Sequence, residues 1–225
     1  MNARQKTACI LNALIFALAT FSATAMFVGF SFMGPSSQFT AMGFAEFKYF
    51  TVDSNVFAGI VSFVALVYFL CHRKENTVGL PRWLYILKLA ATAGVTLTVM
   101  VTVFFLAPTS SNGYFSLFLN SNLFMHFLIP VLCIVTFIFF ERTPDIPLRL
   151  TLLGTVPMLL YTVFYCTNIM LHLENGKATS RCDWYGFLPS GNIAFMPLVI
   201  IFIALVTWGF SLALWRGNWR STTVE

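Results

Sequence analysis

The chain has 225 residues, of which 58% are hydrophobic and only 9% are charged, and its formal net charge is +5. About a quarter of the residues of a soluble domain are charged, so this composition excludes an ordinary soluble protein. Only short connections separate the apolar segments, and residues 1–225 are therefore predicted to form one domain that faces lipid.

Six apolar runs are each long enough to cross a bilayer, which takes about 20 helical residues. The first run follows "MNARQKTA" and contains small residues near Ala25, as a signal peptide does, but it continues through "MFVGFSFM" and is predicted to be an uncleaved span. The sequence thus predicts an all-α integral membrane protein, a six-transmembrane-helix bundle. Its spans are expected at roughly 8–33, 50–71, 83–107, 117–140, 149–172 and 193–215.

The lysines and arginines predict how the bundle is oriented. Ten lie on the side of the chain termini, with Lys88 at a helix entrance: Arg4, Lys6, Arg73, Lys74, Arg82, Lys88, Arg142, Arg149, Arg216 and Arg220. The other side has three: Lys48, Lys177 and Arg181. Both termini are therefore expected in the cytoplasm, in a multi-pass protein of the cell membrane. The positive charge is attributed to topology and contact with lipid headgroups, and not to nucleic-acid binding.

The second span opens with the polar stretch "FKYFTVDSN". Thr51, Ser54 and Asn55 recur at helical spacing and form one small, polar face, whereas Asp53 points roughly the opposite way. Polar residues inside a membrane are costly and often functional. The alternative is that Thr51 only caps the free N–H groups of the helix.

The fourth and fifth spans carry further polar residues. In "NLFMHFLIP", Asn122 and His126 lie one turn apart, and Pro130 has no N–H to give to the His126 carbonyl. In the fifth span Tyr165, Asn168 and His172 follow one stripe. With the termini inside, all these groups fall in the outer half, where they are expected to line one pocket. Interhelical hydrogen bonds, an interfacial aromatic belt and a solvated His172 remain alternatives.

These two motifs resemble those of the androgen-induced membrane protein family, and the chain looks like a bacterial-type relative. The matching positions are Lys48, Tyr49, Thr51, Asn55, Asn122, Met125 and His126. Eukaryotic members of that family are six-helix hydrolases of fatty acid esters of hydroxy fatty acids that use a threonine and a histidine. The resemblance therefore implies Thr51 as nucleophile, His126 as its base and a lipid ester as substrate. Asp53 departs from the family pattern, where an apolar residue is expected, and leaves the substrate open.

General chemistry is consistent with this assignment. A threonine hydroxyl becomes a nucleophile when a base takes its proton, and histidine is the usual base. The start of the second helix favours an oxyanion, and Asn55 or Asn122 would add a donor. Asn168, Tyr165 and His172 are expected to contact the substrate from the fifth span.

Other functions remain open. Proline-broken helices also occur in transporters and channels, His126 and His172 would be the axial ligands of a haem protein, and a non-catalytic membrane subunit needs no site. We expect no cofactor and no metal, because His72 lies on the inner side and the five cysteines lack metal-binding spacing. A disulfide between Cys166 and Cys182 is open, but small buried thiols are the favoured reading.

Overall fold

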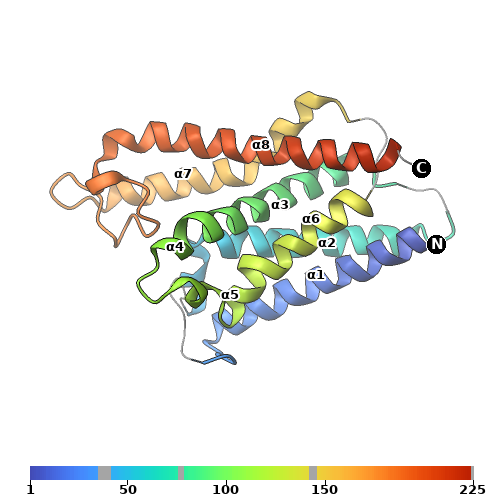
Figure 1. Cartoon of the computed structure of the whole chain (residues 1–225), viewed down its shortest axis with the longest axis horizontal. Coiled ribbons are helices and arrows are strands. Elements are labelled where there is room, and N and C mark those ends of the chain that lie inside the picture. The colour runs from blue at the N-terminus through green and yellow to red at the C-terminus, as the bar shows by residue number, and fades with distance from the viewer. Residues whose placement is uncertain (35–41, 76–78, 142–145, 224–225) are drawn as a thin grey trace.

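The computed structural model describes residues 1–34, 42–75, 79–141 and 146–223. Arg142 and the side chain of Arg220, which contribute to the predicted charge asymmetry, lie outside the described part. Six helices are long and apolar enough to cross a membrane: Ala3–Phe27, Phe50–Cys71, Arg82–Thr109, Ser121–Phe139, Leu148–Leu171 and Ile193–Asn218. The six-span prediction is confirmed. Both chain ends lie at one end of the bundle, here the termini end (Figure 1). Which end faces the cytoplasm stays a prediction.

The spans are assembled from regular and distorted helical segments. The first three are α1 (Ala3–Phe27), α2 (Phe50–Cys71) after the short η1 (Gly43–Lys48), and α3 (Arg82–Val101) continued by η2 (Thr102–Leu106) and α4 (Ala107–Thr109). After η3 (Tyr114–Phe118), the fourth comprises α5 (Ser121–Leu123), η4 (Phe124–Leu128) and α6 (Ile129–Phe139). The last two are η5 (Leu148–Thr155) with α7 (Val156–Leu171), and η7 (Ile193–Phe195) with α8 (Met196–Thr223), preceded by η6 (Pro189–Gly191).

The third span is the centre of the bundle. It contacts α2, α6, α7 and α8, and 72% of its apolar window is buried, against 6% for the last span. Alanines and a glycine recur in α3, and they let neighbouring backbones approach closely, which favours helix association in lipid. At Gly94 an added Cβ would lie 3.6 Å from the Cβ of Ser54 on α2.

Two spans begin more than one residue away from the predicted start. The first starts at Ala3 instead of residue 8, because Asn2 and Gln5 form a reciprocal capping box that starts the helix in the polar N-terminal segment. The fourth starts at Ser121 instead of residue 117. Asn120 there has a left-handed φ of 55°, and its side chain accepts hydrogen bonds from the N–H groups of Phe32 and Met33.

Lys88 corrects the predicted charge pattern. Instead of lying at a helix entrance, its side chain is 2% exposed and its Nζ lies 3.1 Å from Oε1 of the fully buried Glu141. The same Nζ donates to Asn12 Oδ1 at 2.8 Å and to Ser62 Oγ at 3.1 Å. This polar cluster joins α1, α2 and α3 to Glu141, two residues after the end of α6, so Lys88 contributes to packing and not to surface charge.

Candidate functional site

Thr51 lies in the first turn of α2 and lines a cavity of about 80 Å³. The other walls come from α3, η2, α7, α8 and residues 185–188. Most lining side chains are apolar, and those with a hydroxyl group are Thr51, Thr98, Thr102, Tyr161, Thr162, Tyr165 and Tyr185. Typical ligand pockets have roughly 300–1,000 Å³. The cavity as it stands therefore has room for an ester group and a few methylenes.

A larger groove of about 670 Å³ lies on the other side of a pair of aromatic rings. Phe50 and Tyr161 line both hollows, and their ring centroids are 5.2 Å apart. The Tyr161 hydroxyl donates to the Lys48 carbonyl at 2.6 Å, which holds that ring in place. The two rings thus form a wall between the cavity and the groove.

The cap loop, residues 172–192, connects α7 to α8 at the end of the bundle opposite the termini, which we call the cap end (Figure 1). The first N–H groups of a helix have no partner within it. Here the Tyr185 hydroxyl oxygen accepts from the Phe50 N–H at 2.9 Å. A side chain of the protein thus occupies the helix start at which the sequence predicts an oxyanion.

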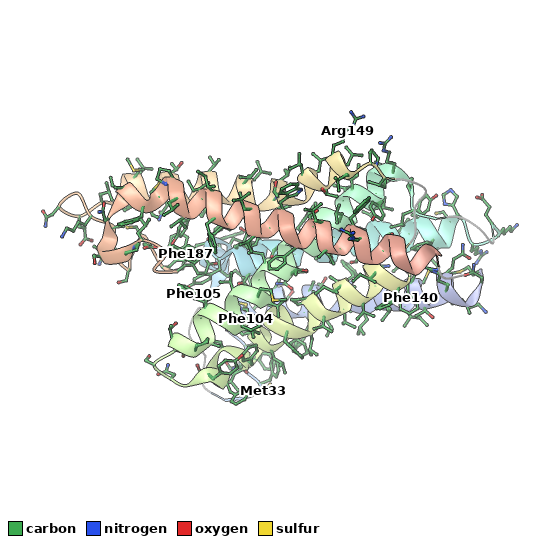
Figure 2. All side chains as sticks on the ribbon, turned by 45° about the horizontal axis from the view of Figure 1, so that its top comes forward. Met33, Phe104, Phe105, Phe140, Arg149 and Phe187 are labelled. Carbon is green, nitrogen blue, oxygen red and sulfur yellow. The ribbon has the colours of Figure 1, made fainter. Side chains whose placement is uncertain are left out.

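A buried carboxylate fixes the cap loop. Asp183 accepts a short hydrogen bond from the Tyr165 hydroxyl and two more from the N–H groups of Phe187 and Leu188, at 3.0 and 2.9 Å. Figure 2 shows Phe187 beside Phe105 of η2, with ring centroids 5.9 Å apart. These contacts set the position of Tyr185, whose pKa is raised because the loop buries it.

His126 lies in η4, a π-helical turn. Pro130 cannot donate to the His126 carbonyl, and the turn widens so that the Ile129 N–H bonds to the Phe124 carbonyl instead. The same distortion, η2, precedes Pro108. His126 is 2% exposed, and its Nδ1 lies 2.7 Å from the Leu117 carbonyl. Because a carbonyl only accepts, Nδ1 carries the hydrogen, and Nε2 of the neutral ring is left as an acceptor.

Asn55 connects the turn of Thr51 to the turn of His126. Its Nδ2 donates to the Thr51 carbonyl at 2.7 Å and to the Met125 carbonyl at 3.0 Å. Both amide hydrogens are engaged, whereas Oδ1 is buried without a hydrogen-bond partner. In this arrangement Asn55 holds the two turns together and has no hydrogen left for an oxyanion.

The predicted site residues fall into three groups. Thr51 and Tyr165 line the cavity, and the buried Asn55, Asn122 and His126 lie on α2, α5 and η4. His126 does not line this cavity, and among the described residues no hydrogen bond joins it to Thr51.

The third group lies apart, at the end of α7. Asn168 donates to the Cys182 carbonyl at 3.3 Å, and the exposed His172 has its Nδ1 2.8 Å from the Asn168 carbonyl. Tyr185 and Asp183 belong to the polar loop that follows the fifth span, and the sequence places them near the expected pocket without giving either a chemical role. The polar, aromatic loop "SRCDWYGF" was the only signal for them.

The described residues contain no group of three His, Cys, Asp or Glu side chains that could hold a metal ion. Cys166 and Cys182 are both free thiols, so the disulfide left open by the sequence is not formed. The Cys182 thiol instead donates to the Thr179 carbonyl at 3.4 Å.

No protein-family model, curated protein or solved structure matches the chain. The fold defines the class, a multi-pass α-helical membrane protein with six spans. The resemblance of the two short motifs remains a prediction, and the function is inferred from the site itself.

Proposed function

We propose that the protein is an intramembrane lipid-ester hydrolase, with Thr51 as nucleophile, His126 as base and a substrate like the fatty acid esters of hydroxy fatty acids. One observation carries the proposal. Thr51 lines an apolar cavity, and the amide of Asn55 ties its turn to the π-helical turn of His126. A nucleophile and a base from different spans are thus held on one scaffold.

In the proposed reaction the Thr51 Oγ1 attacks the ester carbonyl while its proton passes to His126 Nε2. The tetrahedral intermediate collapses, and the alcohol leaves with the proton from the imidazolium. Water, deprotonated by the same nitrogen, then releases the fatty acid and restores Thr51. Catalytic hydrogen bonds are often long or absent before substrate binds. The reaction requires Oγ1 and Nε2 to approach to about 3 Å, and the wide π-helical turn is the segment that would adjust.

The Tyr185 hydroxyl has a defined place in this scheme. An ester carbonyl oxygen that displaced it from the Phe50 N–H would meet the positive end of α2. Asn55 then acts as a positioning residue, because its donors are already used. On α8, Val199, Ile200 and Ile203 are half-exposed lining residues, so an acyl chain would leave the cavity toward the lipid between α7 and α8.

Labelling with a fluorophosphonate probe tests the nucleophile. The wild type should be labelled on Thr51, and Thr51→Ala and His126→Ala should lose the adduct while keeping the wild-type melting temperature. Thr162→Ala is the matched control, because Thr162 lines the same cavity but donates to the Met158 carbonyl. Equal labelling of wild type and Thr51→Ala would refute the assignment.

Transport is the second candidate, and the buried Lys88–Glu141 pair favours it, because charges inside spans often mark transport pathways. Uptake into proteoliposomes that persists in Thr51→Ala would support it. A non-catalytic subunit would show neither activity, and Thr51→Ser would not change the result of any of these assays.

We also infer that the termini end faces the cytoplasm of a cell membrane. Basic residues concentrate there, and Arg149 projects outward from the bundle (Figure 2). Cys71, the exposed thiol at the end of α2, should react with an impermeant maleimide only after the cells are permeabilised. Glu174→Cys in the cap loop should react without permeabilisation.

A further inference from the structure

The groove beyond the Phe50–Tyr161 wall has the dimensions of a lipid chain. Its volume is about 670 Å³, and its lining residues come from η1, α2, α3, η5 and α7. From Leu153 to Phe164 it follows eleven helical residues, or about 17 Å at roughly 1.5 Å each, which is about half of a ~30 Å bilayer core. The groove therefore runs through about one leaflet, on a side of the bundle that faces lipid.

Asp53 is the charged side chain among the lining residues of the groove. It lies in the first turn of α2, at the cap end, where lipid headgroups meet the chains. Among the described residues, no group forms a hydrogen bond or an ion pair with its carboxylate. In the described part of the chain no ion pair joins Asp53 to Lys48, whose ammonium lies 4.9 Å from the Tyr49 ring centroid and 5.8 Å from that of Trp184.

A second carboxyl group lies close to Asp53 at this end of the groove, although it does not line the groove. Glu46 of η1 is 1% exposed, and its Oε2 has no hydrogen-bond partner. Burial, and then repulsion from Asp53, raise the pKa of Glu46 to about 7. Glu46 thus holds its proton up to about neutral pH, and Asp53 is the carboxylate at the end of the apolar groove, which is complementary to an amphiphile with a cationic head.

We propose that this groove binds a phospholipid with a primary ammonium headgroup, a phosphatidylethanolamine, from the leaflet at the cap end. One acyl chain lies in the groove, and the ammonium donates charge-assisted hydrogen bonds to Asp53. A phosphatidylcholine with the same chains has no N–H to donate, and an anionic phosphatidylglycerol is repelled. Headgroup chemistry, and not chain length, sets the preference.

This site does not depend on the proposed hydrolysis. Binding is measured with the Thr51→Ala protein, which cannot turn over an ester through that residue. The Phe50–Tyr161 wall separates the bound lipid from the cavity.

Native mass spectrometry of the detergent-solubilised protein with dioleoyl lipids of the three headgroups tests the proposal. Phosphatidylethanolamine should bind roughly tenfold or more tightly than the other two, as expected for hydrogen bonds to a charged group. Asp53→Asn, nearly the same in shape, should lower that affinity to the level of phosphatidylcholine. Glu174→Gln is the control, because Glu174 is an exposed carboxylate of the cap loop that lies outside the groove.

A steric variant locates the lipid. Leu87 lines the groove and is 37% exposed, so Leu87→Trp fills the groove without burying new volume in the core. It should reduce binding of phosphatidylethanolamine although Asp53 is intact. Equal binding of the three lipids, preference for phosphatidylglycerol, or unchanged binding in Asp53→Asn or Leu87→Trp would each overturn the proposal, provided that the melting temperatures match the wild type.

Discussion

Replacing Lys88 by methionine tests whether the polar cluster at the termini end stabilises the bundle. Methionine keeps much of the length and apolar surface of lysine but removes the ammonium. The Glu141 carboxylate would then stay buried with Asn12 Nδ2, at 2.7 Å, as its neighbouring donor. The partners of Lys88 come from three other segments, so the loss is felt by α1, α2 and the end of α6 together.

The magnitude follows from the geometry of the pair. Two unit charges 3.1 Å apart attract each other by about 5 kcal/mol at an effective dielectric constant of ~20. Removing one partner of a buried pair typically costs 3–5 kcal/mol, because the remaining charge is uncompensated. We therefore expect Lys88→Met to lower the free energy of unfolding by about 3–5 kcal/mol. Lys88→Met with Glu141→Gln should recover about half of this, because no unpaired charge remains.

Reversible unfolding in mixed micelles of sodium dodecyl sulfate and a mild detergent measures these free energies. The wild type, Lys88→Met, Glu141→Gln and the double variant form a double-mutant cycle. Arg181→Met is the control, because Arg181 and Glu174 lie 3.9 Å apart with side chains 86% and 55% exposed. That change should cost less than about 1 kcal/mol. If Lys88→Met cost no more than Arg181→Met, or if the double variant were less stable than Lys88→Met, the electrostatic reasoning would be wrong.

Two further predictions concern packing and pH. At Gly59 an added Cβ would lie 2.7 Å from the Cβ of Ala19, so Gly59→Ala should push α1 from α2 and cost about 1–3 kcal/mol in the same unfolding assay. Gly209→Ala, with nothing within 4 Å, should be neutral or slightly stabilising, and equal losses at both positions would contradict the close approach of the helices. Because the pKa of Glu46 is raised to about 7, the folded protein holds this proton longer than the unfolded chain does. The free energy of unfolding should therefore fall as pH rises toward about 7 and level off above that pH. Melting temperatures of Glu46→Gln, measured over the same pH range, should not show the fall that is due to Glu46. A pH profile of Glu46→Gln identical to that of the wild type would contradict the prediction.

The spans could be predicted because lipid leaves the backbone few options. Every N–H and C=O in the hydrocarbon must find a partner within the protein, so a run of about 20 apolar residues is a helix. The ends of the spans depend on single polar side chains instead. Asn2 starts the first helix early through its cap, and Asn120 ends the preceding segment with its left-handed backbone.

The candidate site could be predicted only in part. Helical spacing places Thr51 and Asn55 on one face of α2, and the structure has that face in contact with η4 through the Met125 carbonyl. Spacing alone does not say which neighbour a face meets. The position of Tyr185 depends on the hydrogen bonds of Asp183 within an irregular loop, and such contacts leave no periodic pattern in a sequence.

The buried position of Lys88 could not be predicted from the sequence either. A lysine six residues after the start of a span is typical of a side chain that extends to the headgroups. Its partner Glu141 follows another span, more than fifty positions along the chain. Only the packing of α1, α2 and α6 around α3 makes the buried position stable, and no local pattern contains that information.

Two polar contacts also fix the register of α2 against α3. Ser54 and Thr98 meet through their hydroxyls at 3.0 Å near Thr51, and Ser62 meets Lys88 at 3.1 Å two turns farther along α2. A slip of α3 by one residue would break both contacts at once. The Ser54–Thr98 contact lies about 15 Å along α3 from Lys88, at roughly 1.5 Å per residue, so it would keep the register at Thr51 when Lys88 is replaced. Loss of the ammonium should therefore loosen the termini end first and leave the cavity beside Thr51 largely intact.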